Sequence, residues 1–308
     1  MPIHRPDIET AKKILADAYK SGLIPFDAKT IEPYCEGGGA LTLKCIDTDR
    51  TEYVVRFPNT ENKLNNMLQE IDTLQFLDAQ NLSVKGGIKI PQPHYVTHDT
   101  YPFVWHQALV GKTLLPHSYH ELNEKQKSDL AKKIAIFMHA MHTCKLPNIS
   151  GKTPTDFIMA QMKLRDLDIL GPKIPAPILQ KYKTLKLNTN YPETLCHFDM
   201  HGRNMALDPK TKDLVGIFDF GDTSIRSCFL DFYKLSFIHR DLTRRVIDIY
   251  NKISNIKIDI HDVDLAYLCT IARQYEHSPN DGILNKSLEN FVQDVTSAQM
   301  QNAQSHKI

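Results

Sequence analysis

The sequence has few of the features that would assign it to a specialised class of protein. Its 308 residues include only six cysteines and one tryptophan. No two cysteines form a CxxC pair, and none has zinc-ligand spacing to a histidine, so the sequence predicts neither a disulfide scaffold nor a structural zinc site. Scattered cysteines of this kind are typical of small core residues in a reducing compartment.

The chain also lacks an excess of charge of either sign. It has 37 Lys and Arg residues against 36 Asp and Glu residues, a formal net charge of +1. Its longest basic clusters are pairs such as Lys12-Lys13 and Arg244-Arg245. Because a protein that binds duplex nucleic acid normally carries a basic excess or a basic stripe, we expect no nucleic-acid partner.

Long apolar runs and internal repeats are absent as well. No window approaches the ~20 apolar residues of a membrane-spanning helix, so we expect no membrane span. Residues 1–23 contain acidic residues and no unbroken apolar region, which is unlike a secretory signal. We therefore expect a soluble cytoplasmic protein, and the length favours two domains or one large two-lobed unit.

Hydrophobic periodicity divides the chain into two parts that differ in character. The first third mixes helices with strands, expected at 7–20 and 61–80 for the helices and at 40–46, 51–57 and 103–107 for the strands. The remainder is mostly helical to about residue 296, with a helix at 124–143 capped by Asn123 and Gln126, a loop at 171–177, and short apolar runs at 194–197 and 214–218. The sequence thus predicts an α+β chain with a strand-rich lobe at 1–107 and a helical lobe at 108–308.

The segment that indicates chemistry is His197-Phe-Asp-Met-His-Gly-Arg-Asn204, followed by an apolar strand that ends in Asp219-Phe-Gly. Phosphoryl transfer from a nucleotide needs one carboxylate that orients the attacking hydroxyl and accepts its proton, and oxygen ligands that hold magnesium against the phosphates. Asp199 suits the first role, and Asn204 and Asp219 suit the second. Each motif alone is weak evidence for phosphoryl transfer, but the two motifs in this order are strong evidence for it.

These motifs resemble the small-molecule branch of the protein-kinase-like superfamily, which includes aminoglycoside and macrolide phosphotransferases and choline kinases. The resemblance implies a two-lobed α+β fold, with a small strand-rich lobe and a larger helical lobe, ATP or GTP as co-substrate, and Mg²⁺. Protein kinases usually have Arg where this chain has Phe198. They also have a long activation segment, whereas only a dozen residues separate Asp219 from Asp231 here.

Two further residues of the second lobe match the family as structural supports. Asp231 lies in a segment that resembles the family's Asp-Leu-Ala helix start, where the Asp braces the backbone of the catalytic loop. His197, the first residue of that loop, is expected to orient it through hydrogen bonds. An Asp that simply caps a helix is the alternative for Asp231.

The first lobe is expected to bind the nucleotide. Arg56 occupies the strand position where kinases carry Lys, and Glu70 lies at the edge of the apolar stripe of the next helix, where it can pair with Arg56. Gly37, Gly38 and Gly39 are suitably placed to let backbone amides approach phosphates, although a tight hairpin turn explains them equally well. A surface arginine and a solvated helix glutamate are the alternatives for Arg56 and Glu70.

The segment Phe103–Gly111 resembles the hinge that meets the nucleotide base through backbone groups. Gln107 and Ala108 are the residues expected at that contact, and Trp105 is expected to pack in the core. Acidic residues also follow position 258, and aminoglycoside-modifying relatives bind polyamines with C-terminal carboxylates. For this chain a solvated helix face is the favoured interpretation of those residues.

The sequence therefore predicts an ATP- or GTP-dependent, magnesium-dependent phosphotransferase that acts on a hydroxyl of a small molecule. Acceptors resembling an aminoglycoside, a macrolide, choline or a sugar all remain open, and so does the oligomeric state. Two alternatives keep the fold: a kinase-like enzyme that modifies a protein or lipid, such as a secreted effector, and a nucleotide-binding module without catalysis.

Overall fold

The computed structural model describes residues 3–35, 40–83, 87–145 and 164–305. The chain forms two compact units. The first comprises Met1–Gln80, Lys89–Gly111 and Gly216–Gly221, and the second comprises Asn81–Ile88, Lys112–Val215 and Asp222–Ile308. Both strands and helices are well represented, which confirms the predicted α+β class.

A five-stranded antiparallel sheet is the centre of the first unit. Its order is β1-β2-β3-β5-β4, with β1 at Thr30–Cys35, β2 at Ala40–Ile46, β3 at Glu52–Pro58, β4 at His94–Val96 and β5 at Phe103–Gln107. The turn between β2 and β3 is closed by Asp47, whose carboxylate accepts the N–H groups of Asp49 and Thr51, both at 2.9 Å. This turn fixes the register of the hairpin that places Arg56.

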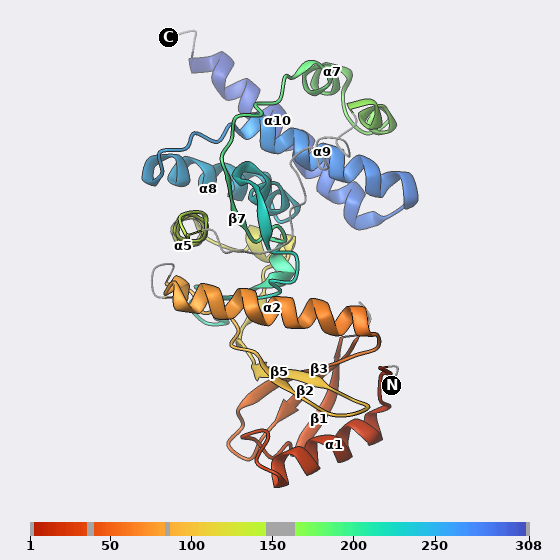
Figure 1. The fold of residues 1–308 in the computed structure, drawn as a ribbon. Helices are drawn as coiled ribbons and strands as arrows, with labels where there is room; N and C mark the ends of the chain where they lie inside the picture. The colour runs from red at the N-terminus through yellow and green to blue at the C-terminus, as the bar shows by residue number, and fades with distance from the viewer. Residues whose placement is uncertain (1–2, 36–39, 84–86, 146–163, 306–308) are drawn as a thin grey trace. The chain divides into compact units, whose positions relative to one another are not determined.

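Two helices cover opposite faces of that sheet, as Figure 1 shows. Helix α1 (Ile8–Lys20) buries Ala11 and Leu15 in one core cluster, against side chains that β2, β3 and β5 send to the same face. Helix α2 (Glu61–Ala79) buries Met67 and Ile71 on the other face, beside Ala40 and Val104. Trp105 is buried in the α1 cluster, as predicted for a packing residue.

The second unit is mainly helical. Its α-helices are α4 (Pro116–His120), α5 (Glu124–His142), α7 (Ala176–Thr184), α8 (Arg240–Ile253), α9 (Ile260–His277) and α10 (Gly282–Ser305). Short strands form two small sheets, β10-β7 and β6-β8-β9, with β6 at Lys112–Thr113, β7 at Glu193–Cys196, β8 at Met205–Leu207, β9 at Leu214–Ile217 and β10 at Ser224–Ser227. All of their residues belong to this unit except Gly216 and Ile217 of β9, which belong to the first.

Several predicted elements are confirmed and others differ. The cap of α5 is as expected, because Asn123 Oδ1 accepts the N–H of Gln126 at 2.9 Å and Gln126 Oε1 accepts the N–H of Asn123 at 3.0 Å. Strands β1, β6, β8 and β10 are not among the predicted elements. A central proline weakens the pattern of β1, β10 is a short polar run, and β6 and β8 have only two and three residues. Helix α7 begins inside the expected loop, and α10 continues to Ser305 rather than ending near residue 296.

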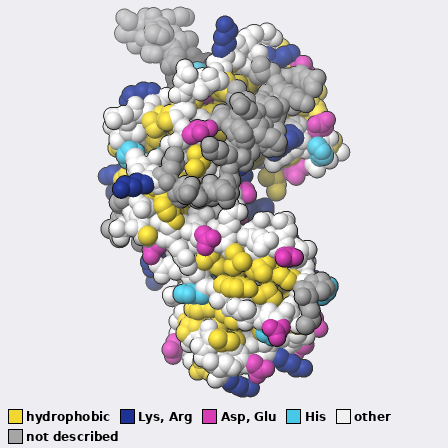
Figure 2. Space-filling view, viewed as in Figure 1, with side chains coloured by type: hydrophobic (Ala, Val, Ile, Leu, Met, Phe, Trp, Pro, Cys, Tyr) yellow, Lys and Arg dark blue, Asp and Glu magenta, His cyan; other side chains and the backbone are white. Residues whose placement is uncertain are grey.

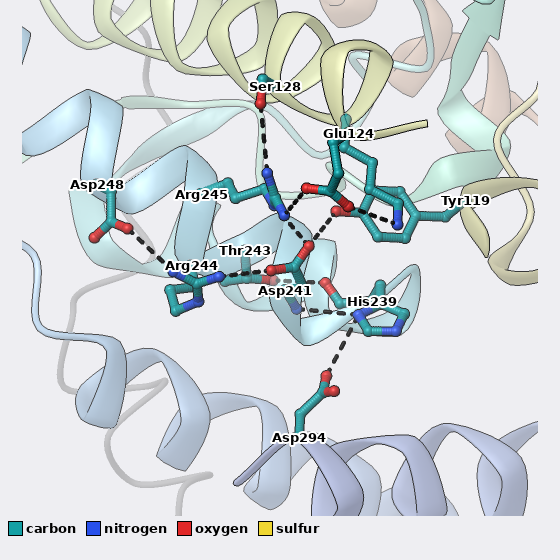
Figure 3. A network of polar contacts seen from close by, with 11 residues as sticks. Tyr119, Glu124, Ser128, His239, Asp241, Thr243, Arg244, Arg245, Asp248 and Asp294 are labelled. Carbon is teal, nitrogen blue, oxygen red and sulfur yellow. Dashed lines mark hydrogen bonds and ion pairs between the residues drawn. The ribbon is translucent and has the colours of Figure 1, made fainter. Parts of the chain in front are cut away.

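A network of polar contacts at the start of α8 ties three helices of the second unit together (Figure 3). Asp241 accepts hydrogen bonds from Tyr119 of α4, from Arg244 and from Arg245, each at 2.7 Å. Arg245 in turn donates to Glu124 of α5 at 2.7 Å. Charge-assisted contacts in a shared network hold their partners more firmly than isolated surface pairs do, so α4, α5 and α8 form a fixed framework.

Charges of both signs are scattered over the face of the molecule shown in Figure 2, in keeping with the balanced composition. Among the described residues, no helix combines the length and apolar character needed to cross a bilayer. The five cysteines whose side chains are described, namely Cys45, Cys144, Cys196, Cys228 and Cys269, are buried and free of disulfides.

Candidate active site

Asp199 lies on the loop between β7 and β8, and this loop turns sharply just before it. Phe198 has φ of 64°, in the left-handed region that a residue with a side chain rarely adopts. The side chain of His197 is fully buried beneath the turn, and its Nδ1 accepts the N–H of Asp199 at 3.2 Å. Strained conformations of this kind persist only where surrounding contacts hold them.

Asp231 provides those contacts. Its carboxylate accepts the backbone N–H of His197 at 3.0 Å and that of Phe198 at 2.5 Å. It also lies 3.0 Å from Nε2 of His142 on α5, whose Nδ1 is 2.9 Å from the hydroxyl of Tyr250 on α8. Burial raises the pKa of Asp231, but the hydrogen bonds and the nearby histidines outweigh it, so that the pKa falls below its ordinary value.

His142, Cys196 and Asp231 place three potential metal-ligand atoms within 4.8 Å of one another. Both ring nitrogens of His142 already have hydrogen-bond partners, and Asp231 already receives two backbone N–H groups. The thiol of Cys196 keeps a pKa well above its ordinary value because it is buried, which disfavours the thiolate that a metal would need. This cluster therefore supports the loop rather than binding a metal.

The carboxylate of Asp199 is surrounded by donors. Asn204 Nδ2 donates to Asp199 Oδ2 at 2.8 Å and to the Asp199 carbonyl at 3.0 Å. Lys234 donates to Oδ1, and Nε2 of His201 lies 3.3 Å from Oδ2. Burial raises the pKa of Asp199, but the hydrogen bonds from His201 and Lys234 and the charge of Lys234 outweigh it, and the pKa lies well below its ordinary value. Asp199 is thus ionised at neutral pH.

Gly202 allows the loop to pass close to the segment after β6. The N–H of Leu114 donates to the carbonyl of Gly202 at 2.9 Å. A Cβ on Gly202 would lie 1.7 Å from the carbonyl oxygen of Leu114, a distance that no side chain can occupy. Only glycine is compatible with this close approach of two backbones.

In the first unit, Glu70 connects Arg56 to the Asp219-Phe220-Gly221 segment. Arg56 Nη1 donates to Glu70 Oε2 at 2.7 Å, and the backbone N–H of Phe220 donates to Glu70 Oε1 at 3.2 Å. Glu70 is 7% exposed, so the carboxylate is neither the solvated helix residue of the alternative interpretation nor unpaired. The predicted partner of Arg56 is therefore the residue that it contacts.

The residues predicted to hold magnesium have suitable ligand atoms. Because the amide nitrogen of Asn204 donates to Asp199, its side-chain oxygen is the atom left to face a cation. Asp219 is exposed and has φ of 64°, which turns the chain at the end of β9. Amide and carboxylate oxygens are the donors that Mg²⁺ prefers, so this donor set fits the metal.

The predicted hinge differs in one detail. The N–H of Ala108 donates to the carbonyl of Glu52 at 2.8 Å and extends the ladder between β3 and β5, so this group is not available to a nucleotide base. Gln107 is exposed at the end of β5. The predicted phosphate-binding residues Gly37, Gly38 and Gly39 lie outside the described residues.

Three residues at the site were not assigned from the sequence. Lys234 and His201 contact Asp199, and His142 contacts Asp231. His201 stands inside the loop motif and Lys234 stands three positions after Asp231, so proximity to the motifs was a weak signal for both. The sequence around His142 carries no signal for its contact, since its partner Asp231 is 89 residues away.

A cavity of about 990 Å³ lies in the second unit beside this loop. Phe198, His201, Gly202 and Lys234 are among its lining residues, as are residues of α4, α9 and α10. A volume in this range accommodates a small organic molecule. The cavity is therefore the candidate acceptor site.

Comparison with known proteins agrees with these features. Solved structures with the same fold include the streptomycin–ATP complex of APH(2″)-IIa (21% identity, TM-score 0.63, covering 94% of this chain and 97% of that one). Another is the GDP complex of aminoglycoside 2′-phosphotransferase-IIIa (19% identity, TM-score 0.64, covering 93% of this chain and 99% of that one). A third is macrolide 2′-phosphotransferase type I (13% identity, TM-score 0.58, covering 92% of this chain and 97% of that one). The predicted kinase-like α+β fold is thereby confirmed.

The family assignment comes from the sequence itself. The model of the phosphotransferase enzyme family matches residues 30–257, about three quarters of the chain. This match confirms both the resemblance to small-molecule kinases and the prediction that the chain is a phosphotransferase. The chain belongs to the phosphotransferase enzyme family.

Proposed function

We propose that this protein transfers the γ-phosphoryl group of ATP or GTP to a hydroxyl group of a small molecule, with Asp199 as the residue that orients the hydroxyl and accepts its proton. The observation that carries the proposal is the setting of Asp199, an ionised carboxylate on a braced loop beside a cavity of small-molecule size. Solved structures of the same fold contain ATP, GDP, streptomycin or kanamycin, which supports a nucleotide and a small acceptor.

The transfer conserves atoms and charge in one displacement. The acceptor oxygen forms a bond to the γ-phosphorus, and the bond from that phosphorus to the β–γ bridging oxygen breaks. The nucleoside diphosphate leaves with the electron pair, and the hydroxyl proton passes to Asp199. Because the pKa of Asp199 is low, the carboxylate first orients the acceptor hydroxyl. It takes the proton late in the transfer, when the bond between the acceptor oxygen and the γ-phosphorus has made that hydroxyl acidic.

The remaining roles follow from the contacts within each unit. Arg56, held by Glu70, is proposed to bind phosphate oxygens of the nucleotide through its planar guanidinium. Asn204 and Asp219 are proposed to hold magnesium, which when bound neutralises phosphate charge. His197 and Asp231 are proposed to hold the backbone that carries Asp199. Gln107 and the carbonyl of Ala108 are proposed to lie at the nucleotide base.

The observations favour a small acceptor over a protein. In place of a long activation segment, the residues after Asp222 form strand β10, which pairs along its length with β7. Only a dozen residues separate Asp219 from Asp231, which leaves little chain for a segment that docks a peptide substrate.

The test is phosphoryl transfer by the purified protein to a panel of hydroxylated small molecules, followed by ³¹P NMR and by nucleoside diphosphate release. We expect Asp199→Asn to lower kcat by about 10²–10⁴-fold while nucleotide affinity stays unchanged. Asp213→Asn, which removes an exposed carboxylate from the turn before β9, is the matched control and retains activity. If Asp199→Asn turned over acceptor at the wild-type rate, the assignment would be wrong, and labelling of lysate proteins alone would favour a protein kinase.

A further inference from the structure

Among the described residues that line the cavity beside the catalytic loop, positive charges outnumber negative ones. Six of these residues are cationic, and one, Asp222, carries a carboxylate. The cationic residues are Arg203, Arg226, Lys234, Arg240, Arg273 and Lys286. Four histidines, His117, His120, His201 and His239, also line it and can only add positive charge.

Some of these cations are already neutralised. Lys234 pairs with Asp199, and Arg240 donates to both carboxylate oxygens of the buried Asp264, at 2.8–3.2 Å. Lys286 lies 3.3 Å from Glu289, but both side chains are about 70% exposed, so water screens this pair.

Arg226, the third residue of β10, has contacts of a different kind. Its guanidinium lies over the ring of Phe198 at 3.7 Å from the centroid, and its Nε donates to Ser224 Oγ at 2.6 Å. Both contacts are neutral, and no described residue forms an ion pair with Arg226 within 4.0 Å. Stacking on Phe198 fixes the plane of the guanidinium next to the residue that carries the catalytic carboxylate.

Two carboxylates of helix α9, those of Asp262 and Asp264, do not offset this charge. Asp262 and Asp264 are 4% and 0% exposed, and Tyr191 and Tyr182 donate to them at 2.7 Å. These two carboxylates are buried within the fold, which differs from the solvated helix face expected of the acidic residues after position 258. Asp259, Glu276 and Asp281 are exposed as expected, and none of the five lines the cavity. Among the described lining residues, a polyamine acceptor would meet six cationic side chains and one carboxylate, that of Asp222.

We propose that the acceptor carries an anionic group, a carboxylate or a phosphate ester, in addition to the hydroxyl that receives the phosphoryl group, and that Arg226 binds that anionic group. The proposal rests on the proposed function for the identity of the cavity as the acceptor site. Guanidinium groups bind carboxylates and phosphates through paired N–H donors, and a group fixed by stacking loses little freedom on binding.

The experiment measures binding without catalysis, so its failure is distinguishable from failure of the proposed function. Four sugars share one ring and differ in charge: glucose is neutral, glucosamine is cationic, glucuronate carries a carboxylate and glucose 6-phosphate carries a phosphate. Thermal shift and isothermal calorimetry with the full chain, with and without nucleoside diphosphate, give their relative affinities. We expect either anionic sugar or both to bind at least tenfold more tightly than glucose, with glucosamine the weakest, and to bind less tightly as salt rises.

Variants connect the preference to Arg226. We expect Arg226→Gln to weaken binding of the preferred anionic sugar about tenfold or more, and Arg226→Lys to weaken it less, because the charge remains but the paired donors do not. Lys252→Gln is the matched control, because Lys252 is an exposed residue of α8 that does not line the cavity. We expect this variant to bind the anionic sugar with unchanged affinity.

Three results would overturn the proposal. The first is that glucose or glucosamine binds as tightly as the anionic sugars. The second is that Arg226→Gln keeps the full preference for the anion. The third is that neither anionic sugar stabilises or binds the protein at any soluble concentration. Phosphoryl transfer from ATP to a cationic acceptor in the same assay would uphold the proposed function while rejecting this one.

Discussion

The carboxylate of Glu70 accepts the backbone N–H of Phe220, a residue 150 positions further along the chain, at 3.2 Å. The same carboxylate accepts a hydrogen bond from Arg56 at 2.7 Å. Both contacts lie within the first unit and are largely shielded from water, so each is stronger than it would be on an exposed surface. One buried residue thus orients the proposed phosphate-binding cation and holds the backbone directly after Asp219.

This arrangement predicts the effect of Glu70→Gln. The substitution keeps the size of the side chain but places an amide NH₂ against either Arg56 or the N–H of Phe220, so one contact is lost whichever way the amide faces. We expect the KM for ATP to rise about tenfold, with loss of one charge-assisted hydrogen bond as the reason. Initial rates at varied ATP measure it, and a KM equal to that of wild type would contradict the assignment.

Asp72→Asn is the matched control for that substitution. Asp72 lies on the exposed face of the same helix α2. Its removal changes the net charge by the same amount as Glu70→Gln, so equal effects of both variants would show that the effect is one of overall charge.

The contact between Lys234 and Asp199 predicts a change in pH dependence. Lys234 and His201 keep the pKa of Asp199 below its ordinary value, so Asp199 remains ionised and active down to acidic pH. In Lys234→Met the stabilising cation is gone, the pKa of Asp199 rises, and the acidic limb of kcat moves to higher pH by about one unit or more. Lys234→Arg keeps the charge and is expected to keep the limb near its wild-type position. An acidic limb that stays in place in Lys234→Met would rule out this control of Asp199.

The residues that could be predicted from the sequence are those whose role depends on local spacing. The loop from His197 to Asn204 closes on itself, because Asn204 bonds to Asp199 five positions earlier. Arg56 and Glu70 are 14 positions apart on a strand and the helix that follows, and the helical period was enough to choose Glu70.

What could not be predicted depends on contacts between distant segments. Asp231 meets His142 across 89 residues, and helix α5 offers no pattern that separates His142 from a packing histidine. The charge of the cavity is likewise assembled from separate segments, among them the catalytic loop, β10, α9 and α10, none of which is strongly basic by itself. Composition sums these charges over the whole chain and therefore conceals the local excess.

Asp231 is predicted to stabilise both the fold and the catalytic loop. Asp231→Ala would leave two buried backbone N–H groups and the ring of His142 without their acceptor. We expect the free energy of unfolding to fall by about 3–5 kcal/mol and activity to fall with it, since the loop that carries Asp199 loses its anchor. Urea unfolding of wild type and variant measures the difference. An Asp that merely caps a helix would cost about 1 kcal/mol, which separates the two interpretations.

The pH dependence of stability tests the same residue in the wild-type protein. The pKa of Asp231 in the folded state lies below its ordinary value of 3.8. A group with a lowered folded pKa contributes stability above its unfolded pKa, and that contribution is lost as the pH falls through the folded pKa. We expect the acid-induced loss of stability below about pH 4 to be shallower in Asp231→Asn than in wild type. Parallel stability curves for the two proteins would mean that Asp231 is not a stabilising anion.

Gly202 gives a prediction that depends on geometry alone. In Gly202→Ala the new Cβ would lie 1.7 Å from the carbonyl oxygen of Leu114, so either the catalytic loop or the segment that leads into α4 must move. The movement breaks the hydrogen bond from the N–H of Leu114 to the carbonyl of Gly202 and displaces both Asp199 and Asn204 from their positions. We expect a loss of kcat of at least 10²-fold, because a displacement of about 1 Å at reacting groups has an effect of that size. Gly171→Ala is the matched control, since Gly171 does not line the cavity and a Cβ there would lie 3.2 Å from the nearest atom, the carbonyl oxygen of Asp168. If Gly202→Ala were as active and as stable as Gly171→Ala, the two backbones could not approach as closely as the structure shows.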